Sequence, residues 1–457
     1  MRQTGSPVTA SRAHQGLADG GYPAVRGEPG LPRLLASAVR APGTTTTLEP
    51  GLDLVAHLRR HGRSRFRGAA LIEHAQAAGL TGRGGAAFPI ATKLAAVAGA
   101  GGSVVVVANG AEGEPASAKD AALLWFAPHL VLDGLQLAAD AVGAGTAYLY
   151  VHAGCDARGG PDLPWHLRVA LAQRQAAGTD RVRVALIEAP PRFLAGEETA
   201  LVARINGGAA RPSDKQYRVF QHGVGGRPTL VQNVETLAHL ALIARHGAAW
   251  FRSVGTRAEP GSMLCTVRGP DGQARVLETA LGTPLSWLLR LGDDVRAVLV
   301  GGYHGGWLSL TDARRVDLCN ADLRPAGTMA GAGVLVALPA AHCGLAETAS
   351  VARYLALESA GQCGPCFNGL PAIAAALAEL AQPQPAGRAL AHLQRWVGLL
   401  AGRGACHHPD GTVRFVASAL TVFAAEITAH AHGRCTATSS ELFLPVAAPA
   451  MTESDWR

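Results

Sequence analysis

The feature that most constrains the fold is a continuous apolar run, SVVVVAN, at positions 103–109. An unbroken β-branched run of this kind is typical of a strand that is buried on both faces of a sheet. Two further apolar runs, at 147–151 and 182–188, are separated from it and from each other by helical patterns at 121–142 and 163–177. Because strands and helices alternate, the sequence predicts a parallel sheet of the α/β class.

Polar residues gather just beyond the first predicted strand, where the sequence reads NGAEGEPASAKD. Open α/β sheets bind ligands outside the carboxyl ends of their strands, so this segment is predicted to line a binding site. A second candidate is the loop GLTGRGGAAFPIATK at 79–93, which places four glycines and Arg83 ahead of a predicted helix. Backbone amides at such a helix start attract anions, and phosphate is the expected ligand. A purely structural turn is the alternative.

Lysine usage and net charge narrow the choice of ligand. Of the 41 basic residues, only Lys93, Lys119 and Lys215 are lysines, which makes these positions candidates for a site that needs a compact ammonium group. The net charge of +7 permits an anionic partner, but basic residues do not interleave with aromatics, so nucleic acid is not expected.

No apolar run reaches membrane-spanning length and no signal sequence begins the chain. A cytoplasmic protein is expected.

In the remaining part of the chain the predicted secondary structure changes twice. Between about 262 and 322, short strands with a single helix in the middle indicate a small module of the β-grasp type. Beyond residue 339, helical periodicity predicts an up-and-down four-helix bundle. Its apolar stripes lie at 345–356, 370–380, 390–400 and 416–427.

Three of the eight cysteines form the clearest metal-binding pattern. Cys363 and Cys366 lie in CGPC and Cys406 lies in GACHHPDG, and both loops fall at the same end of the predicted bundle, so the three thiolates can meet around a cation. An iron–sulfur cluster, a zinc ion completed by His407 or His408, and a CxxC redox pair are the alternatives. The other five cysteines are expected to be small apolar fillers: Cys155, Cys265, Cys319, Cys343 and Cys435.

Taken in order, these segments resemble the NADH-binding flavoprotein subunit of respiratory complex I and its relatives in NAD-linked hydrogenases and formate dehydrogenases. The family's GxRGRGGAGFPxxxKW corresponds to GLTGRGGAAFPIATKL, and its CNxDExEPGxxKDR corresponds to ANGAEGEPASAKDA. GEETAL occurs unchanged, NNVETL is QNVETL, and SCGxCxPCRxG is SAGQCGPCFNG. Matching stretches run from about residue 50 to 430.

The resemblance implies an α/β flavin domain with a Rossmann-like parallel sheet, then a β-grasp (SLBB-like) domain, and a C-terminal four-helix bundle. The corresponding division of the chain is a disordered tail at 1–48, an FMN- and NADH-binding domain at 49–245, a β-grasp domain at 246–338, an iron–sulfur bundle at 339–435 and a flexible tail at 436–457.

The resemblance also implies which residues bind FMN and NADH. The glycine loop would hold the FMN phosphate and ribityl groups, Phe88 would stack against the nicotinamide nucleotide, and Glu114 and Lys215 would contact NADH. No side chain is expected to be catalytic itself, because the flavin carries the chemistry and the protein supplies geometry and charge. The full cofactor-binding set is Gly82, Arg83, Gly84, Gly85, Phe88, Lys93, Asn109, Glu112, Glu114, Gly196, Glu197, Glu198, Lys215 and Asn233.

The implied activity is NADH oxidation through FMN, with electrons passing to an iron–sulfur cluster and on to a partner such as a ferredoxin or a 2Fe–2S subunit. Any membrane contact would be indirect, through a complex. One family cysteine is replaced by Ala360, so Cys363, Cys366 and Cys406 are left to hold a 4Fe–4S cluster, a 3Fe–4S cluster or zinc. The alternative function is therefore a non-catalytic or assembly subunit that keeps the fold. The Trp after the motif lysine is Leu94, and the aromatic residue expected just beyond it is Ala96, so one stacking face for NADH is missing.

Overall fold

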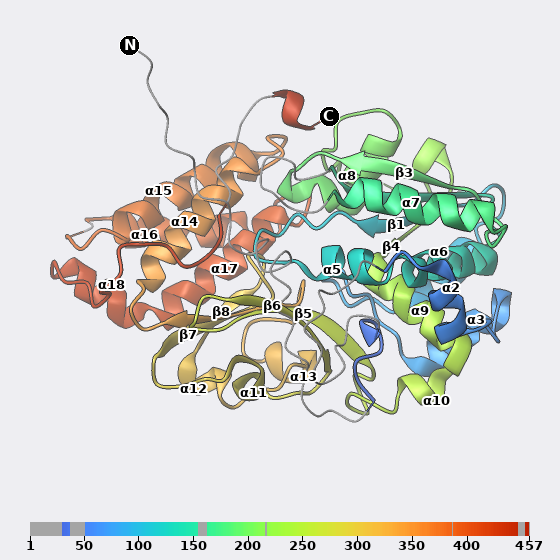
Figure 1. Cartoon of the computed structure of the whole chain (residues 1–457). Coiled ribbons are helices and arrows are strands. Elements are labelled where there is room, and N and C mark those ends of the chain that lie inside the picture. The colour runs from blue at the N-terminus through green and yellow to red at the C-terminus, as the bar shows by residue number, and fades with distance from the viewer. Residues whose placement is uncertain are drawn as a thin grey trace, which may run out of the picture.

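The computed structural model describes residues 30–36, 51–153, 162–214, 217–385, 387–446 and 453–456. Along this part of the chain a parallel sheet with helices is followed by a mixed sheet and then by a set of helices (Figure 1). Most of the predicted tail at 1–48 lies outside the described residues, as do Cys155 and Lys215.

The first sheet has four strands in the order β3-β2-β1-β4, and every neighbouring pair is parallel. Val105 at the start of β1 pairs with Thr146 of β2 on one side and Thr229 of β4 on the other. The predicted parallel α/β sheet is confirmed. Its strands are β1 Val105–Gly110, β2 Thr146–His152, β3 Val184–Ala189 and β4 Thr229–Asn233.

Separate cores cover the two faces of this sheet, which explains the unbroken apolar run in β1. Val106 and Ala108 face the larger core, and Val105 and Val107 face a smaller core that includes Leu201. Helix α8 Glu198–Ile205 packs on the smaller-core face. The other helices of this part are α2 Leu54–His61, α3 Gly68–Ala78, α4 Ile90–Ala98, α5 Lys119–Phe126, α6 Pro128–Val142, α7 Leu163–Ala176, α9 Val234–His246 and α10 Ala248–Phe251.

The single helix predicted at 121–142 is wrong, because the structure has two helices there, α5 and α6, bent by 96°. Pro128 begins the second helix, and proline at a helix start has no N–H to contribute to the preceding turn. The break sets α5 apart as a short helix whose start, at Lys119, follows the loop after β1. The helix predicted over 416–427 is likewise broken at Phe423, where α17 and α18 meet at 70°.

The second sheet is mixed, with strand order β6-β5-β9-β7-β8. Strands β5 and β9 run parallel at its centre, and the other neighbouring pairs are antiparallel. Where one helix was expected, two four-residue helices accompany α11. The elements are β5 Ser262–Arg268, β6 Ala274–Ala280, α11 Leu285–Leu289, β7 Val295–Val300, β8 Gly306–Ser309, α12 Leu310–Ala313, α13 Asn320–Leu323 and β9 Val334–Pro339.

The C-terminal helices share a core with the mixed sheet: Leu299 of β7 and Val336 of β9 lie in the same cluster as Leu355 and Val416. Figure 1 shows these helices beside β7 and β8. They are α14 Gly344–Leu357, α15 Leu370–Leu380, α16 Ala389–Leu400, α17 His408–Val422 and α18 Ala424–Ala431.

Part of the predicted N-terminal tail is packed onto the rest of the chain. The backbone N–H groups of Arg33 and Leu34 donate to Glu278 Oε2 at 2.8 and 2.7 Å, and the Arg33 guanidinium stacks on Trp250 at 4.0 Å. This contact has no sequence signal, because it joins residues more than 200 positions apart. Among the described residues, no single helix is long and apolar enough to span a bilayer, although the bent pairs α5–α6 and α17–α18 pass the same test together.

Candidate functional site

The glycine loop is closed at its base and rests on the carboxyl end of β4. Gly82 N donates to Phe88 O at 2.8 Å, and Thr81 and Pro89 form a bridge. A Cβ on Gly84 would lie 3.2 Å from the Cβ of Asn233, so the backbone approaches the strand end more closely than most side chains allow. Gly85 has φ +113°, a conformation that only glycine adopts without strain.

Arg83 ties this loop to its surroundings. Its N–H donates to Thr236 Oγ1 at 2.9 Å, and its guanidinium donates to Ser262 O at 3.2 Å and to Thr81 Oγ1 at 2.7 Å. The side chain is buried, and burial lowers its pKa. These contacts make Arg83 a brace between the loop, α9 and β5; its predicted part in cofactor binding stays a prediction.

Two asparagines stand at the ends of adjacent strands, as predicted for a parallel sheet. Asn109 of β1 donates from Nδ2 to Gly196 O at 2.9 Å, and Asn233 of β4 donates to Asp120 Oδ2 at 2.7 Å. Asn233 Oδ1 also accepts from Glu235 N at 3.0 Å and so caps α9. Beside it, Gln232 Nε2 is buried and has no hydrogen-bond partner among the described residues. A free amide donor at this edge is what an acceptor-rich ligand requires.

A buried ion network holds these strand ends in place. Lys119 Nζ contacts Asp120 Oδ1 at 2.7 Å and Glu235 Oε2 at 2.8 Å, and the Lys119 side chain is 2% exposed. Burial alone would lower the pKa of Lys119, but the two carboxylates raise it, so the ammonium stays charged. Lys119 lowers the pKa of Glu235 to about 2 against the opposing effect of burial. Asp120 and Glu235 were not predicted as site residues, although both lie in the motifs that carry the resemblance.

Glu112 caps the start of α5. Its carboxylate accepts from the N–H groups of Lys119 at 3.0 Å, Asp120 at 3.3 Å and Ala121 at 3.2 Å, and from the Ser117 hydroxyl. Burial, with the neighbouring charge of Asp120, raises the pKa of Glu112 to about 7. Glu112 therefore fixes the loop after β1 through the backbone of α5.

Glu114 joins the first sheet's loop to the second sheet. Its Oε2 accepts from Tyr303 N at 2.8 Å, and a Cβ on Gly302 would lie 2.6 Å from the same oxygen. Burial raises the pKa of Glu114 to about 7. The carboxylate thus joins the loop after β1 to the loop between β7 and β8, and its predicted contact with NADH stays a prediction.

The GEETAL segment closes the far side of the site. A Cβ on Gly196 would lie 2.5 Å from Ala111 O, so this position accepts only glycine. Glu197 caps α8 by accepting from Thr199 N at 2.8 Å, and Glu198 Oε1 lies 3.1 Å from Lys93 Nζ on α4. The Lys93–Glu198 pair joins the glycine loop's helix to GEETAL across the site.

Phe88 is 47% exposed on the glycine loop, which is unusual for a large apolar side chain and leaves a ring face free for stacking. Together with the close glycine contacts, Lys93 and the free Gln232 donor, this arrangement fits a flavin nucleotide: glycine amides and an ammonium for its phosphate, and strand-end amides for its ring. Lys215 lies outside the described residues.

Cys363, Cys366 and Cys406 lie together at the end of the helices that the sequence predicted. The Sγ atoms of Cys363 and Cys366 are 3.6 Å apart. Burial raises the pKa of the Cys406 thiol to about 11, and the charges of Glu197, Cys366 and Cys363 add to this. Glu197 therefore lies close to both the strand-end site and the cysteines.

The position of the fourth cysteine of the family motif is occupied by a packed apolar residue. Ala360 is buried against Leu194 and Trp456, and Ala210 N donates to Trp456 O at 2.7 Å. No ligand atom is available at residue 360, so the donor set fits a cluster held by three thiolates.

His408 is engaged elsewhere: its Nε2 contacts Leu355 O at 2.8 Å and its Nδ1 contacts His304 at 3.0 Å. His407 is 81% exposed beside Asp410. Zn–S bonds of about 2.3 Å require every pair of ligand sulfurs to lie within about 4.6 Å. Among the described residues, the one set of three ligands packed within 4.8 Å does not include Cys363, Cys366 and Cys406. A single zinc ion on these three cysteines is therefore disfavoured.

Comparison with known proteins agrees with this geometry. A family model described as the Nuo51 FMN-binding domain matches residues 75–242, and one described as the NADH-ubiquinone oxidoreductase-F iron-sulfur binding region matches residues 346–430. The two ranges contain the strand-end site and the three clustered cysteines, respectively. In both ranges the chain is therefore similar to the F subunits of NADH-quinone oxidoreductases.

The chain is similar to the F 2 subunit of NADH-quinone oxidoreductase of Rhizobium meliloti (strain 1021), which is 28% identical over 71% of this chain and 80% of its own length. The F subunit of the same enzyme of Rickettsia bellii (strain OSU 85-389) is 28% identical over 58% of this chain and 66% of its own. The crystal structure of an NAD+-reducing [NiFe]-hydrogenase in the air-oxidized state superposes with a TM-score of 0.72 at 29% identity, covering 79% of this chain and 62% of that chain.

The chain departs from the glycine-loop motif of the family it resembles at a strained position. Ala87 stands where the motif has glycine, and its φ is 51°, in the left-handed region that favours glycine. The loop keeps the glycine-type backbone although the residue has changed. Sequence comparison with the motif alone could have located this strain.

Proposed function

We propose that this chain oxidises NADH at an FMN bound by the glycine loop and the ends of β1 and β4, and passes the electrons to an iron–sulfur cluster on Cys363, Cys366 and Cys406. The observation that carries the proposal is that the chain holds both sites: the glycine loop and strand ends lie in the range matched by the FMN-binding domain model, and the three cysteines lie in the range matched by the iron-sulfur binding region model.

Bound FMN would supply the chemistry, accepting a hydride and releasing its electrons one at a time. The protein's part is to bind and orient. Lys93 faces the site as a charged group 31% exposed, which suits a contact with phosphate. Phe88 offers a ring for stacking, and at the strand ends Gln232 Nε2 is the amide donor without a hydrogen-bond partner among the described residues, while Asn109 and Asn233 hold Gly196 and Asp120 in place.

The Lys119 network would keep Asn233 in position. Asp120 accepts the Asn233 amide, and Lys119 keeps Asp120 and Glu235 paired in a buried setting. Such contacts hold the ligand-binding residue from behind. They keep the geometry of the binding site fixed while the charge of the ligand changes. We therefore assign Lys119 a positioning role.

The mixed sheet supports the assignment of a β-grasp domain, because parallel central strands β5 and β9 flanked by antiparallel pairs are the expected arrangement for that fold. Helices α14 to α18, with a bend at Phe423, support a four-helix bundle whose fourth member is broken. We propose a separate iron–sulfur protein, a ferredoxin or 2Fe–2S subunit, as the electron acceptor. A cytoplasmic location, peripheral to a membrane complex, stays a prediction.

The second candidate is a non-catalytic subunit that keeps the fold, and Ala360 is the observation that favours it. Metal analysis and EPR of anaerobically purified, NADH-treated protein separate the two. Iron with an EPR signal that appears on NADH addition supports electron transfer. Bound FMN with no iron, and no signal after NADH, contradicts the proposed electron exit.

A further inference from the structure

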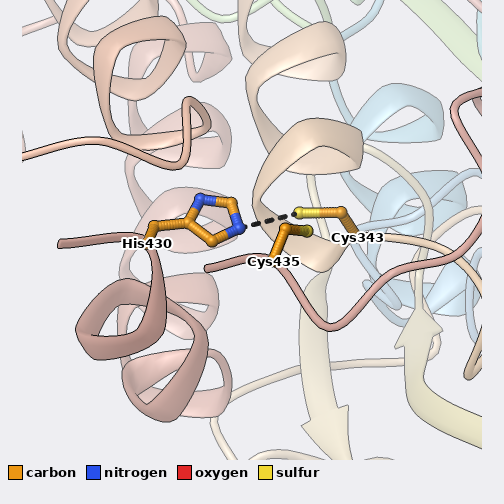
Figure 2. A group of neighbouring side chains, drawn as sticks. All are labelled: Cys343, His430 and Cys435. Atoms are coloured by element: carbon orange, nitrogen blue, oxygen red, sulfur yellow. Dashed lines mark hydrogen bonds between the residues drawn. The ribbon is translucent and has the colours of Figure 1, made fainter. Parts of the chain in front are cut away.

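A second group of metal-binding side chains lies at the opposite end of α14 from the CGPC loop. Cys343 immediately precedes α14, His430 lies in the last turn of α18, and Cys435 follows α18 (Figure 2). Their Sγ and ring nitrogen atoms all lie within 4.8 Å of one another. No other set of three Cys, His, Asp or Glu ligands in the described part of the chain is packed so closely.

His430 is oriented as a ligand. Its Nδ1 lies 3.0 Å from Leu380 O, and because a carbonyl can only accept, Nδ1 must carry the hydrogen. Nε2 of the neutral ring then has a free lone pair, and it points at Cys343 Sγ, 3.7 Å away. A histidine whose outer N–H is fixed by a backbone carbonyl is the usual arrangement of a metal ligand.

Cys343 is surrounded by groups that suit a cation. Its Sγ accepts from Ala346 N at 3.5 Å at the start of α14, and burial, together with Glu426 and Cys435, raises the pKa of the thiol. Glu426 Oε2 lies 3.8 Å from the same sulfur, while Glu426 Oε1 is paired with Arg296. A hydrogen bond from the Cys343 thiol to His430 would explain that pair alone and would leave the position of Cys435 unexplained.

We infer that Cys343, His430 and Cys435 bind a zinc ion that fastens the C-terminal segment to the start of α14. Two thiolates and one imidazole are the ligand types that zinc prefers, and the spread of the ligand atoms matches Zn–S and Zn–N bonds of about 2.0–2.3 Å after small side-chain movements. The fourth position would be taken by water or by Glu426. This site is independent of the proposed FMN and cluster sites.

The chain after Cys435 already runs along the start of α14. Thr438 N and Ser439 N both donate to Ala341 O at 2.9 Å. Phe443 N and Leu444 N donate to the buried Glu347 carboxylate at 2.6 and 3.0 Å. Residues 436–446 therefore make defined contacts where the sequence predicted a flexible tail, and an ion at Cys435 would close the near end of this segment.

The test measures Zn²⁺ binding to the full-length protein by competition with a chromophoric chelator, in wild type and in Cys435→Ser, Cys406→Ser and His432→Gln. Cys435 is exposed, so its substitution leaves the core intact. His432 is the matched control, because it is an exposed histidine two residues from His430 whose Nδ1 contacts Thr428 O at 2.8 Å. Zinc affinity is expected to fall about ten-fold or more in Cys435→Ser and to be unchanged in the other two variants.

A second readout is trypsin cleavage after the exposed Arg434, which Zn²⁺ should slow in wild type and not in Cys435→Ser. Zinc that is lost in Cys406→Ser but kept in Cys435→Ser overturns the inference, since the ion would then sit on the other cysteines. Absence of zinc binding overturns it as well. A Cys343–Cys435 disulfide, detected by intact mass after alkylation of anaerobically purified protein, would also overturn it.

Discussion

Replacing Lys119 by methionine tests the buried network behind the proposed flavin site. The Lys119 side chain is 2% exposed, and its partners Asp120 and Glu235 are 7% and 0% exposed. Removing the ammonium leaves two carboxylates buried without their cation, and breaking a buried pair in this way costs about 3–5 kcal/mol. The free energy of unfolding should fall by that amount in urea titrations of FMN-free protein, in which ligand binding adds nothing.

Lys93→Met is the matched control, because it removes the same group from a pair whose members are 31% and 38% exposed. An exposed pair of this kind contributes at most about 1 kcal/mol, so stability should barely change while FMN affinity falls. Lys119→Met with Glu235→Gln should recover part of the loss, since one uncompensated charge is removed. A Lys119→Met protein within about 1 kcal/mol of wild type would refute the network's assigned role.

Three further substitutions probe other parts of the account. Glu114 has a pKa raised to about 7 in the folded chain, so this group binds more protons folded than unfolded, and its contribution to stability falls as the pH rises from about 4.5 to 7. Glu114→Gln should therefore gain up to about 3 kcal/mol over wild type at pH 8 and little at pH 4.5, as measured by urea unfolding at both pH values; an equal change at both would contradict the burial of its charge. Ala87→Gly should stabilise the chain by about 0.5–1 kcal/mol because φ is 51° there, and an unchanged or lower melting temperature would argue against strain in the loop. Ala360→Cys restores a fourth thiolate beside the three clustered cysteines, so iron per chain and the EPR line shape should change; identical iron content and spectra would show that residue 360 does not face the cluster.

The parallel sheet was predictable because its central strand carries its own signal. A run of four valines buried on both faces has few alternatives, and β1 begins within two residues of the predicted start. The helix at 121–142 failed because apolar periodicity continues through Pro128 on both sides of the bend. Periodicity reports which residues are buried and does not report the direction of a helix.

The contacts of individual site residues were less predictable. The sequence placed Arg83 in an anion-binding loop, yet its guanidinium contacts Thr81 and Ser262, because the choice of partner depends on how β5 packs against the loop. Glycine positions were more informative, since Gly84 and Gly196 are required by contacts with Asn233 and Ala111 that a side chain would obstruct.

Some of the predictions for the cysteines agree with the structure and others do not. Cys363, Cys366 and Cys406 were grouped correctly from helix order alone, and Cys265 is a buried filler as expected. Cys343 and Cys435 were treated as isolated, although the structure brings them together with His430. Their proximity depends on the bend between α17 and α18, which returns His430 toward α14 and which the sequence pattern did not reveal.

The measurement that tests the central claim most directly is an anaerobic titration of the FMN-loaded full-length chain with NADH, followed by the flavin absorbance band. Bleaching at stoichiometric NADH is the predicted result, because Phe88 and the glycine loop would hold the nucleotide against the flavin. A chain that binds FMN and stays yellow at excess NADH would contradict the account.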